Sequence, residues 1–337
     1  MKRMFATMFA TLPLASAQAQ MVRNEALKML HPDFAGNRMV SGSFQNLFPA
    51  SQPRKLIEVL RHKLTHTNPY EAQKREQTHT MPIVLHSKGI ACQEDFICWL
   101  GHATFLIQIG GRCIVTDPCL SAPPLTKRHT PVPLPMQAIK PDYLLISHGH
   151  FDHLDAWTVK HFDDAHALVP LGMEGIIRGM NPTISVQEAG WFQRYEITED
   201  FEVVFLPSHH WHRRSVCDTN RVLWGSFLIK TPHRTLYFAG DTAYSPHFKE
   251  IGRHFDIDIA MLPIGAYEPR AIMKQMHMSP EDALRAYADL GAEVLIPMHY
   301  GTFDLTDEPM GLPPKELMRL RRNERVREVM IGEVYRI

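Results

Sequence analysis

The chain has 337 residues, of which 45% are hydrophobic, enough apolar material for the core of one large domain or two small ones. Lysine plus arginine equals aspartate plus glutamate, at 36 each, so the chain lacks the basic footprint of a nucleic-acid-binding protein. No stretch of about 18 or more apolar residues occurs, and we expect no membrane-spanning helix.

The first twenty residues have the outline of a secretory signal. Lys2 and Arg3 precede a moderately apolar stretch that ends in small residues of A-x-A form. Threonines and a proline dilute that stretch, however, and Met21 is an alternative start. The five cysteines, odd in number and without C-x-x-C spacing, indicate reduced thiols packed as small hydrophobes. The compartment therefore stays open: the periplasm if residues 1–20 are a signal peptide, otherwise the cytoplasm, peripheral to the membrane.

Residues 21–84 are predicted to form an N-terminal strap and helix ahead of a catalytic domain at 85–337. Proline-rich residues 21–53 favour an irregular segment, and the apolar spacing of residues 54–63 favours a surface helix. Residues 65–81 are polar and predict a loop.

A β pattern begins at Ile97. Three apolar runs, at 97–100, 103–109 and 113–118, are typical of strands, and Gly110-Gly111 predicts a hairpin between the second and third. His102, between the first two runs, is either a polar edge residue or a site residue. Asp117 ends the third run, and we expect it to support a nearby site rather than only to form a turn.

A histidine-rich cluster follows a long proline-rich segment at 118–140. The apolar run 143–146 leads directly into an H-x-H-x-D-H sequence. Its four candidate metal ligands are His148, His150, Asp152 and His153. Imidazole and carboxylate groups suit zinc or iron, and four ligands on one loop cannot all reach one ion. The spacing therefore predicts two metal ions, or one metal ion and a general base.

Further candidate ligands follow other strand-like runs, in a region where strands alternate with helices as in an α/β layer. Run 201–206 precedes His209 and His210, only one of which can face the site, because side chains alternate along an extended chain. Asp241 follows run 235–238, and its two oxygens can bridge two cations; His299 follows run 294–296. We expect these loops to gather at one edge of a sheet.

A helix start is marked near the C-terminal end of the site region. Ser279 is a predicted N-cap and Pro280 the first helical residue. His277 lies just outside this cap and is free to point into a site. From Pro309 onward the chain is charged, and we expect it to be peripheral.

Further motifs accompany the histidine cluster, at roughly residues 95 to 305. They are Trp99-Leu100-Gly101-His102-Ala103-Thr104, Thr116-Asp117-Pro118, Pro207 to Trp211, Val222-Leu223-Trp224-Gly225-Ser226, Phe238-Ala239-Gly240-Asp241-Thr242, Pro263 to Arg270 and His299 to Phe303. With these motifs the chain resembles the metallo-β-lactamase superfamily, and within it the N-acylphosphatidylethanolamine-hydrolysing phospholipase D family.

The resemblance implies an α+β fold, an αββα sandwich with a dizinc centre at one edge. The implied ligands are His148, His150 and His210 for one zinc ion and Asp152, His153 and His299 for the other, with Asp241 bridging them. The same resemblance selects His210 over His209. Iron and manganese also fit these ligands. Implied catalytic residues are Asp152, Asp241 and His277, with His277 beside the substrate phosphate; His102, Asp117 and Tyr267 are expected to support the site or the substrate.

The implied activity is hydrolysis of N-acylphosphatidylethanolamine to N-acylethanolamine and phosphatidate by a dizinc-bound hydroxide. The implied partners are a phospholipid at a membrane surface and a second copy in a homodimer. The metal ligands alone do not exclude a lactonase, a thioesterase or another ester or phosphodiester hydrolase on the same fold. A redox di-iron protein and a non-catalytic membrane scaffold are weaker alternatives, because every ligand fits a hydrolytic dizinc site.

Overall fold

Two β-sheets packed face to face form the centre of the molecule. The computed structural model describes residues 18–48, 65–76, 81–90 and 94–337. The strands are β1 (Gln20–Val22), β2 (Lys28–Met29), β3 (Asn37–Val40), β4 (Ser43–Phe44), β5 (Phe96–Gly101), β6 (Thr104–Ile109), β7 (Arg112–Thr116), β8 (Tyr143–Leu145), β9 (His166–Pro170), β10 (Ser185–Ala189), β11 (Gln193–Arg194), β12 (Glu202–Leu206), β13 (Ser226–Lys230), β14 (Thr235–Phe238), β15 (Ile259–Pro263), β16 (Val294–Met298) and β17 (Val334–Arg336). The helices are α2 (Glu71–Glu76), α3 (Ala156–Val159), α4 (Glu174–Met180), α5 (His247–His254), α6 (Arg270–Met273), α7 (Pro280–Leu290) and α8 (Leu312–Leu320), with a 3₁₀ turn at Met136–Ala138.

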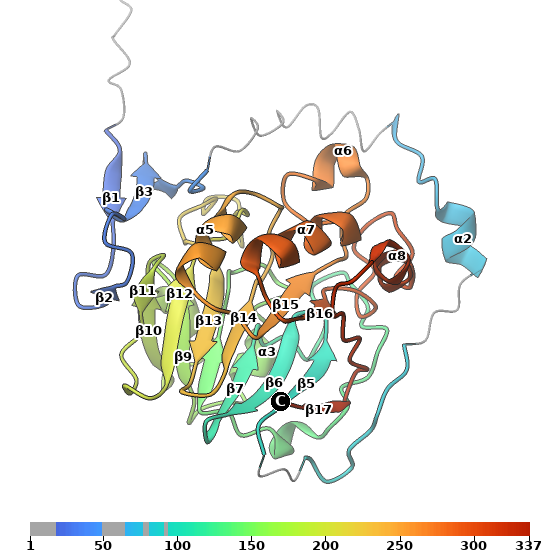
Figure 1. Cartoon of the computed structure of the whole chain (residues 1–337), viewed down its shortest axis with the longest axis horizontal. Coiled ribbons are helices and arrows are strands. Elements are labelled where there is room, and N and C mark those ends of the chain that lie inside the picture. The colour runs from blue at the N-terminus through green and yellow to red at the C-terminus, as the bar shows by residue number, and fades with distance from the viewer. Residues whose placement is uncertain (1–17, 49–64, 77–80, 91–93) are drawn as a thin grey trace, which may run out of the picture.

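The layers follow the predicted αββα order. One seven-stranded sheet runs β10-β9-β8-β7-β6-β5-β17, and the other runs β16-β15-β14-β13-β12-β11-β2. Helix α7 packs on β15 and on α5 and α8, so these three helices cover the second sheet (Figure 1). Helix α4 packs on β10 and on α3, which covers the first sheet. A small sheet, β1-β3-β4, lies beside the sandwich.

The apolar side chains of β5 show that this strand is buried on both faces. Ile97 and Trp99 are fully buried in the core between the sheets, whereas Cys98 and Leu100 are fully buried in a second core under α3 and α4. Successive side chains of a strand point to opposite faces, so a continuous apolar run is what a strand buried on both faces requires. The first sheet is thus an inner layer of the sandwich.

The predicted hairpin at Gly110-Gly111 is confirmed. Strands β6 and β7 are antiparallel, with Ile109 opposite Arg112. Gly110 and Gly111 have φ angles of 55° and 73°, which suit a two-residue turn that needs a left-handed backbone at both positions.

Three of the sequence-based expectations were wrong in part. The polar segment 65–81 contains helix α2, and the segment 21–53, expected to be irregular, contains strands, one of which (β2) pairs with β11 at the edge of the second sheet. The charged tail is not peripheral, because it forms α8 and β17 and buries Leu317 and Ile331 completely. Isolated apolar residues in a charged context gave no periodic signal there. The helix predicted at 54–63 lies outside the described residues.

The remaining composition-based expectations concern membranes and thiols. Within the parts of the chain that the structure describes, no helix is both long enough and apolar enough to cross a bilayer.

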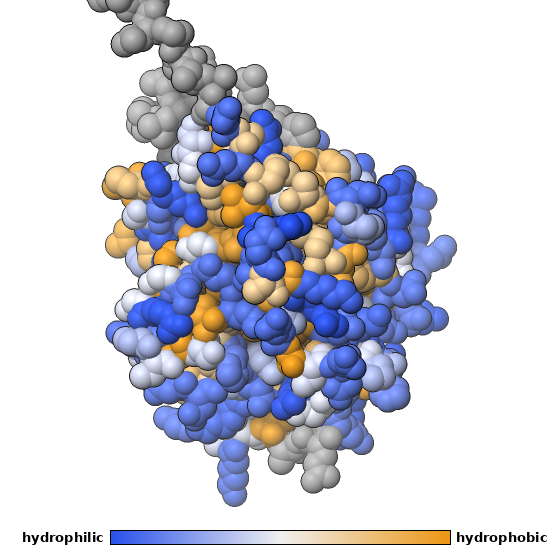
Figure 2. Space-filling view, turned by 90° about the vertical axis from the view of Figure 1, so that its left-hand side faces the viewer, coloured by the Kyte–Doolittle hydropathy of each residue, from blue (hydrophilic) through white to orange (hydrophobic). Residues whose placement is uncertain are grey.

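On the side of the molecule that carries β1 and β2, apolar side chains gather toward the upper half among hydrophilic ones (Figure 2). Cys98 and Cys119 are buried free thiols, as predicted, whereas Cys217 is exposed. Cys92 and residues 1–17 of the predicted signal lie outside the described residues.

The predicted start of α7 is confirmed. The Ser279 hydroxyl accepts a hydrogen bond from the Asp282 N–H (3.3 Å), and the Asp282 carboxylate accepts one from the Ser279 N–H (3.2 Å), forming a capping box with Pro280 at the first turn.

Ser279→Ala removes half of this capping box. We expect the free energy of unfolding to fall by about 1 kcal/mol, because an orphan N–H at the helix start loses its acceptor. Urea unfolding followed by circular dichroism measures the change. Glu281→Ala, in the same helical turn but outside the box, is the control; equal midpoints for the two variants would contradict the prediction.

Candidate metal centre

Loops from both sheets meet at one edge of the sandwich. His148, His150, Asp152 and His153 follow β8, and His102 lies in the turn between β5 and β6, all in the first sheet. His210 follows β12, Asp241 follows β14 and His299 follows β16, all in the second sheet. The structure therefore brings together the residues that the sequence singled out after its strand-like runs.

One group of ligand atoms comprises His148, His150, His210 and Asp241. Nε2 of His148 lies 2.8 Å from Nδ1 of His150, which lies 3.2 Å from Nε2 of His210. Ligand atoms bound at about 2.0–2.1 Å to one tetrahedral zinc ion lie about 3.3 Å apart. Three imidazole nitrogens at this spacing can hold a single metal ion.

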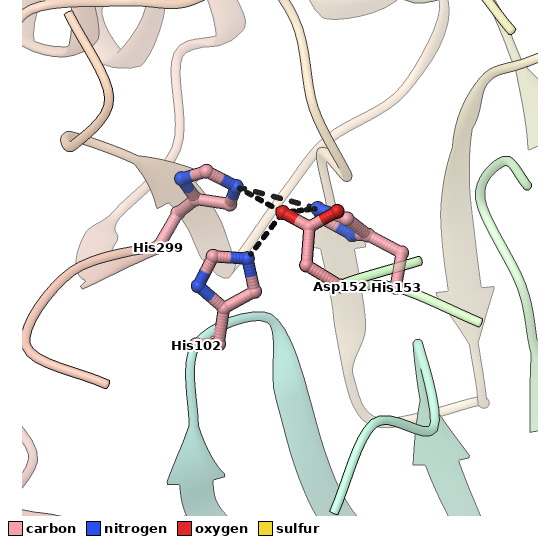
Figure 3. A group of neighbouring side chains, drawn as sticks. All are labelled: His102, Asp152, His153 and His299. Atoms are coloured by element: carbon pink, nitrogen blue, oxygen red, sulfur yellow. Dashed lines mark hydrogen bonds and ion pairs between the residues drawn. The ribbon is translucent and has the colours of Figure 1, made fainter. Parts of the chain in front are cut away.

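A second group comprises His102, Asp152, His153 and His299 (Figure 3). One oxygen of Asp152 lies 3.1 Å from Nε2 of His102, 3.7 Å from Nε2 of His153 and 3.9 Å from Nε2 of His299. Nε2 of His153 and Nε2 of His299 are 3.3 Å apart. His102, undecided from the sequence, thus contacts the Asp152 carboxylate from the β5–β6 turn.

Asp241 lies between the two groups. Its Oδ2 is 3.9 Å from Nε2 of His148 and 3.2 Å from Nε2 of His153. Its Oδ1 lies 2.9 Å from Nε2 of His299, yet accepts no hydrogen bond although it is buried. A buried carboxylate oxygen without a hydrogen bond, surrounded by imidazole nitrogens, is what we expect of a carboxylate that binds a metal ion with each of its oxygens.

Outer hydrogen bonds orient three of the imidazoles. Nδ1 of His153 donates to Asp117 (2.6 Å) and Nδ1 of His210 donates to the Met276 carbonyl (2.9 Å). Nδ1 of His148 donates to the Ser147 hydroxyl (2.9 Å), which itself donates to Asp117 (2.7 Å). Each bond occupies Nδ1, so the Nε2 lone pair faces the cluster. Asp117, predicted from the sequence to support a nearby site, thus contacts His153 directly and His148 through Ser147.

The electrostatics of the cluster follow from burial and from three neighbouring carboxylates. Burial lowers the pKa of His150 and of His102 to about 3. Burial alone would also lower the pKa of His153, but Asp241, Asp152 and Asp117 outweigh it and raise that pKa well above its usual value. The carboxylates thus favour a positive charge at this buried position, and a divalent cation can supply that charge.

The motifs around His102 and His299 hold each other in place. The His102 carbonyl accepts hydrogen bonds from the Trp99 indole and from the His299 N–H, both 2.9 Å, and Thr302 accepts one from the His102 N–H (2.9 Å). His102 and His299 have φ angles of 55° and 65°, and Asp117 one of 33°. Left-handed backbone at residues other than glycine costs of order 1–3 kcal/mol and concentrates at functional sites.

Two further expected residues differ in position. His277 is close to the cluster, with Nδ1 3.8 Å from Oδ2 of Asp241, and its side chain is 12% exposed. The Tyr267 hydroxyl instead donates to Glu316 on α8 (2.6 Å), so its hydrogen bond supports the helix layer rather than a ligand.

Three supporting residues were missed by the sequence analysis. The Asn46 side chain accepts from the His210 N–H (3.2 Å) and donates to the His210 carbonyl (3.0 Å). Arg214 donates to the carbonyls of Gly149 and Leu154 (both 2.8 Å), and His212 accepts from the Gly149 N–H (3.2 Å). These three side chains bind backbone groups of other segments, which a sequence does not reveal. Only the neighbouring histidines of His212 gave a sequence signal.

The sandwich with ligand loops at one edge defines a metallo-β-lactamase fold. The family described as "Beta-lactamase superfamily domain" matches residues 112–300, more than half of the chain. A metallo hydrolase from the archaeon Ignicoccus hospitalis aligns with a TM-score of 0.57 at 21% identity, over 73% of this chain and 99% of that one.

Two relatives refine this assignment. An uncharacterized protein of Mycobacterium tuberculosis is 34% identical over 85% of this chain and 80% of its own length. N-acyl-phosphatidylethanolamine-hydrolyzing phospholipase D 1 of Caenorhabditis elegans is 33% identical over 66% of this chain and 68% of its own length. The chain belongs to the metallo-β-lactamase superfamily and, within it, to the family similar to N-acylphosphatidylethanolamine-hydrolysing phospholipase D. It is a metal-dependent hydrolase of that superfamily.

Asn46→Ala removes both hydrogen bonds that hold the backbone of His210. We expect zinc affinity to fall about tenfold or more, as for other residues that orient a metal ligand, while the overall secondary structure is unchanged. Zinc competition with a chromophoric chelator measures the affinity.

Asn24→Ala is the matched control, because Asn24 also joins the N-terminal segment to the sandwich, by a bond to the Glu188 carbonyl (2.8 Å), without touching a ligand. A loss of affinity of the same size in both variants would show that Asn46 acts only through the attachment of the segment.

The buried histidines also predict how the metal-free protein responds to acid. Burial lowers the folded-state pKa of His102 and His150 to about 3, and that of His148 and His210 well below the ordinary value. Such histidines bind protons in the unfolded state below pH ~6.5 but stay neutral when folded, so acid favours unfolding. The raised pKa of His153 has the opposite effect, because this one histidine binds a proton more tightly in the folded state.

We therefore expect chelator-treated protein to lose about 1 kcal/mol or more of unfolding free energy between pH 7.5 and 5.5. Urea titrations at the two pH values measure the change. A higher urea midpoint at pH 5.5 than at pH 7.5 would contradict the expected direction.

Proposed function

We propose that the chain is a phospholipase D-type phosphodiesterase that hydrolyses N-acylphosphatidylethanolamine-like phospholipids to N-acylethanolamine and phosphatidate. The observation that carries the proposal is the position of Asp241 between two groups of ligand atoms. The likeness to the worm enzyme, which extends well beyond the metal motif, supports this substrate class. We place the catalytic machinery in residues 85–337.

In this proposal the centre holds two zinc ions. His148, His150 and His210 would hold one, Asp152, His153 and His299 the other, and Asp241 would bridge them. Zinc ions lower the pKa of a bound water to about 7 and stabilise charge on phosphate oxygens. Two sites sharing one carboxylate suit a phosphodiester, because both the entering and the departing oxygen of an in-line displacement develop charge.

The protein side chains would position the reactants. Asp241 and Asp152 are acceptors that would orient the attacking water, and both are charged because neighbouring histidines hold their pKa values low against the opposing effect of burial. His102 would fix the Asp152 carboxylate by its 3.1 Å contact.

His277 is the proposed phosphate-binding residue. It is a partly exposed histidine beside Asp241, and its Nδ1 has no hydrogen-bond partner although that atom is buried. Burial lowers the His277 pKa to about 4, so the ring is neutral at pH 7, and its single N–H would donate a hydrogen bond to a phosphate oxygen.

The rim of the centre suits a lipid. The Trp211 ring lies edge-on to His150, with centroids 4.8 Å apart, and the Phe151 side chain is 40% exposed beneath Arg214, whose guanidinium carbon lies 4.1 Å from the ring centroid. Apolar rings beside cationic groups can contact acyl chains and phosphate at a membrane surface.

Asp241→Asn should reduce release of N-acylethanolamine from N-acylphosphatidylethanolamine in detergent micelles by at least about 100-fold. An amide cannot supply two anionic oxygens to two cations, and losing one charged contact in a buried site costs several kcal/mol, where each 1.4 kcal/mol is tenfold. Mass spectrometry of the released amide measures the rate, with chelator-treated wild type as a second inactive sample.

Asp256→Asn, a change at an exposed carboxylate, is the matched control and should retain full activity. The same samples are offered a lactone, a thioester and a simple phosphodiester. If metal-loaded wild type hydrolyses one of these compounds and releases no N-acylethanolamine, the proposed substrate is wrong. The chain is then a hydrolase of the compound that it cleaves.

A further inference from the structure

A second cluster of metal-ligating side chains lies where the N-terminal segment meets α5. His31 follows β2, while Glu250 and His254 are one helical turn apart on α5. One ligand atom from each residue lies within 4.8 Å of the others. The cluster shares no residue with the centre described above.

The distances within this cluster are close to those between the ligands of a single metal ion. Nε2 of His31 lies 3.3 Å from Oε1 of Glu250, and Nδ1 of His254 lies 3.8 Å from the same oxygen. The corresponding separation around a tetrahedral zinc ion is about 3.3 Å. Arg253 approaches the other carboxylate oxygen, Oε2, at 3.4 Å, which leaves Oε1 to the two histidines.

The tautomer of each histidine decides which of its ring nitrogens is free to bind a metal ion. Nδ1 of His31 is buried and has no hydrogen-bond partner. Nδ1 of His254 lies 2.9 Å from the Glu250 carbonyl, and when it donates there, Nε2 carries the lone pair. The side chains of His31, Glu250 and His254 are 16%, 26% and 32% exposed, so water can reach the cluster and complete a coordination shell.

We propose that His31, Glu250 and His254 bind one divalent first-row transition metal ion, with water as the fourth ligand. Two imidazoles and one carboxylate are a zinc-type donor set, whereas calcium and magnesium prefer oxygen ligands alone. Binding requires both rings to be neutral and the His254 ring to present a free nitrogen, which a change of tautomer or a ring rotation supplies.

The metal ion would fasten the N-terminal segment to the catalytic layers. His31 and Glu250 are 219 residues apart in the chain, and β2 is held by only two register pairs to β11. The His31 ring already packs edge-on against Phe192, with centroids 4.9 Å apart, which pre-positions it. The same segment carries Asn46, which holds His210.

The test counts zinc per chain in the full-length protein. After equilibration with buffered zinc and gel filtration, Glu250→Gln and His254→Ala should each hold one zinc ion fewer than wild type, or bind that ion at least about tenfold more weakly by calorimetry. His254→Ala also removes a ring contact with His31 (centroids 4.6 Å apart), whereas Glu250→Gln preserves the side-chain shape, so a loss of zinc in Glu250→Gln separates metal binding from packing.

His233→Ala, which removes an exposed histidine outside the cluster, is the control and should match wild type. Zinc should also slow hydrogen exchange in residues 20–40 of wild type but not of Glu250→Gln. The test compares the zinc content of wild type with that of each variant. Its outcome therefore does not depend on the number of ions at the catalytic centre or on the substrate. Equal zinc content in wild type and both variants would overturn the proposal.

Discussion

The buried carboxylate of Asp117 is the contact on which the ligand loop depends. It lies at the end of β7 and accepts hydrogen bonds from the Ser147 N–H, the Ser147 hydroxyl and the His153 ring, at 2.7, 2.7 and 2.6 Å. Because Ser147 in turn holds His148, one carboxylate orients a ligand in each of the two groups. Hydrogen bonds to a charged group are worth about 1.5–3 kcal/mol, so this arrangement is both strong and specific in direction.

The second constraint joins the two sheets. His102 belongs to the β5–β6 turn of one sheet and His299 follows β16 of the other, and the His299 N–H donates to the His102 carbonyl. The fully buried Trp99 donates to the same carbonyl. Both histidines accept a left-handed backbone, which the packed core beneath them must sustain. The His102 carbonyl therefore joins the two sheets at the edge that carries the candidate ligands.

The candidate ligands could be predicted from the sequence for a local reason. Apolar runs mark buried strands, and a histidine or aspartate directly after such a run must lie at a sheet edge, as His148, Asp241 and His299 do. Asn46 and Arg214 gave no such signal, because they act on backbone groups of distant segments and any polar side chain in a loop looks alike in a sequence. The burial of Ile331 was missed for a related reason, since a single apolar residue in a charged tail has no period.

The residues that can bind metal ions are mostly buried, whereas the residues proposed to contact the substrate are more exposed. Asp241 and most of the clustered imidazoles are almost completely buried, and outer hydrogen bonds orient three of these rings, so a change at any of them would disturb the centre. The groups proposed to meet a substrate are different: Phe151 is 40% exposed, and Nδ1 of His277 has no hydrogen-bond partner beside the cluster. A change at the rim alters what fits without disturbing Asp117 or Ser147. This is why one set of ligands is compatible with several hydrolytic reactions, and why the identity of the substrate has to be sought in the rim.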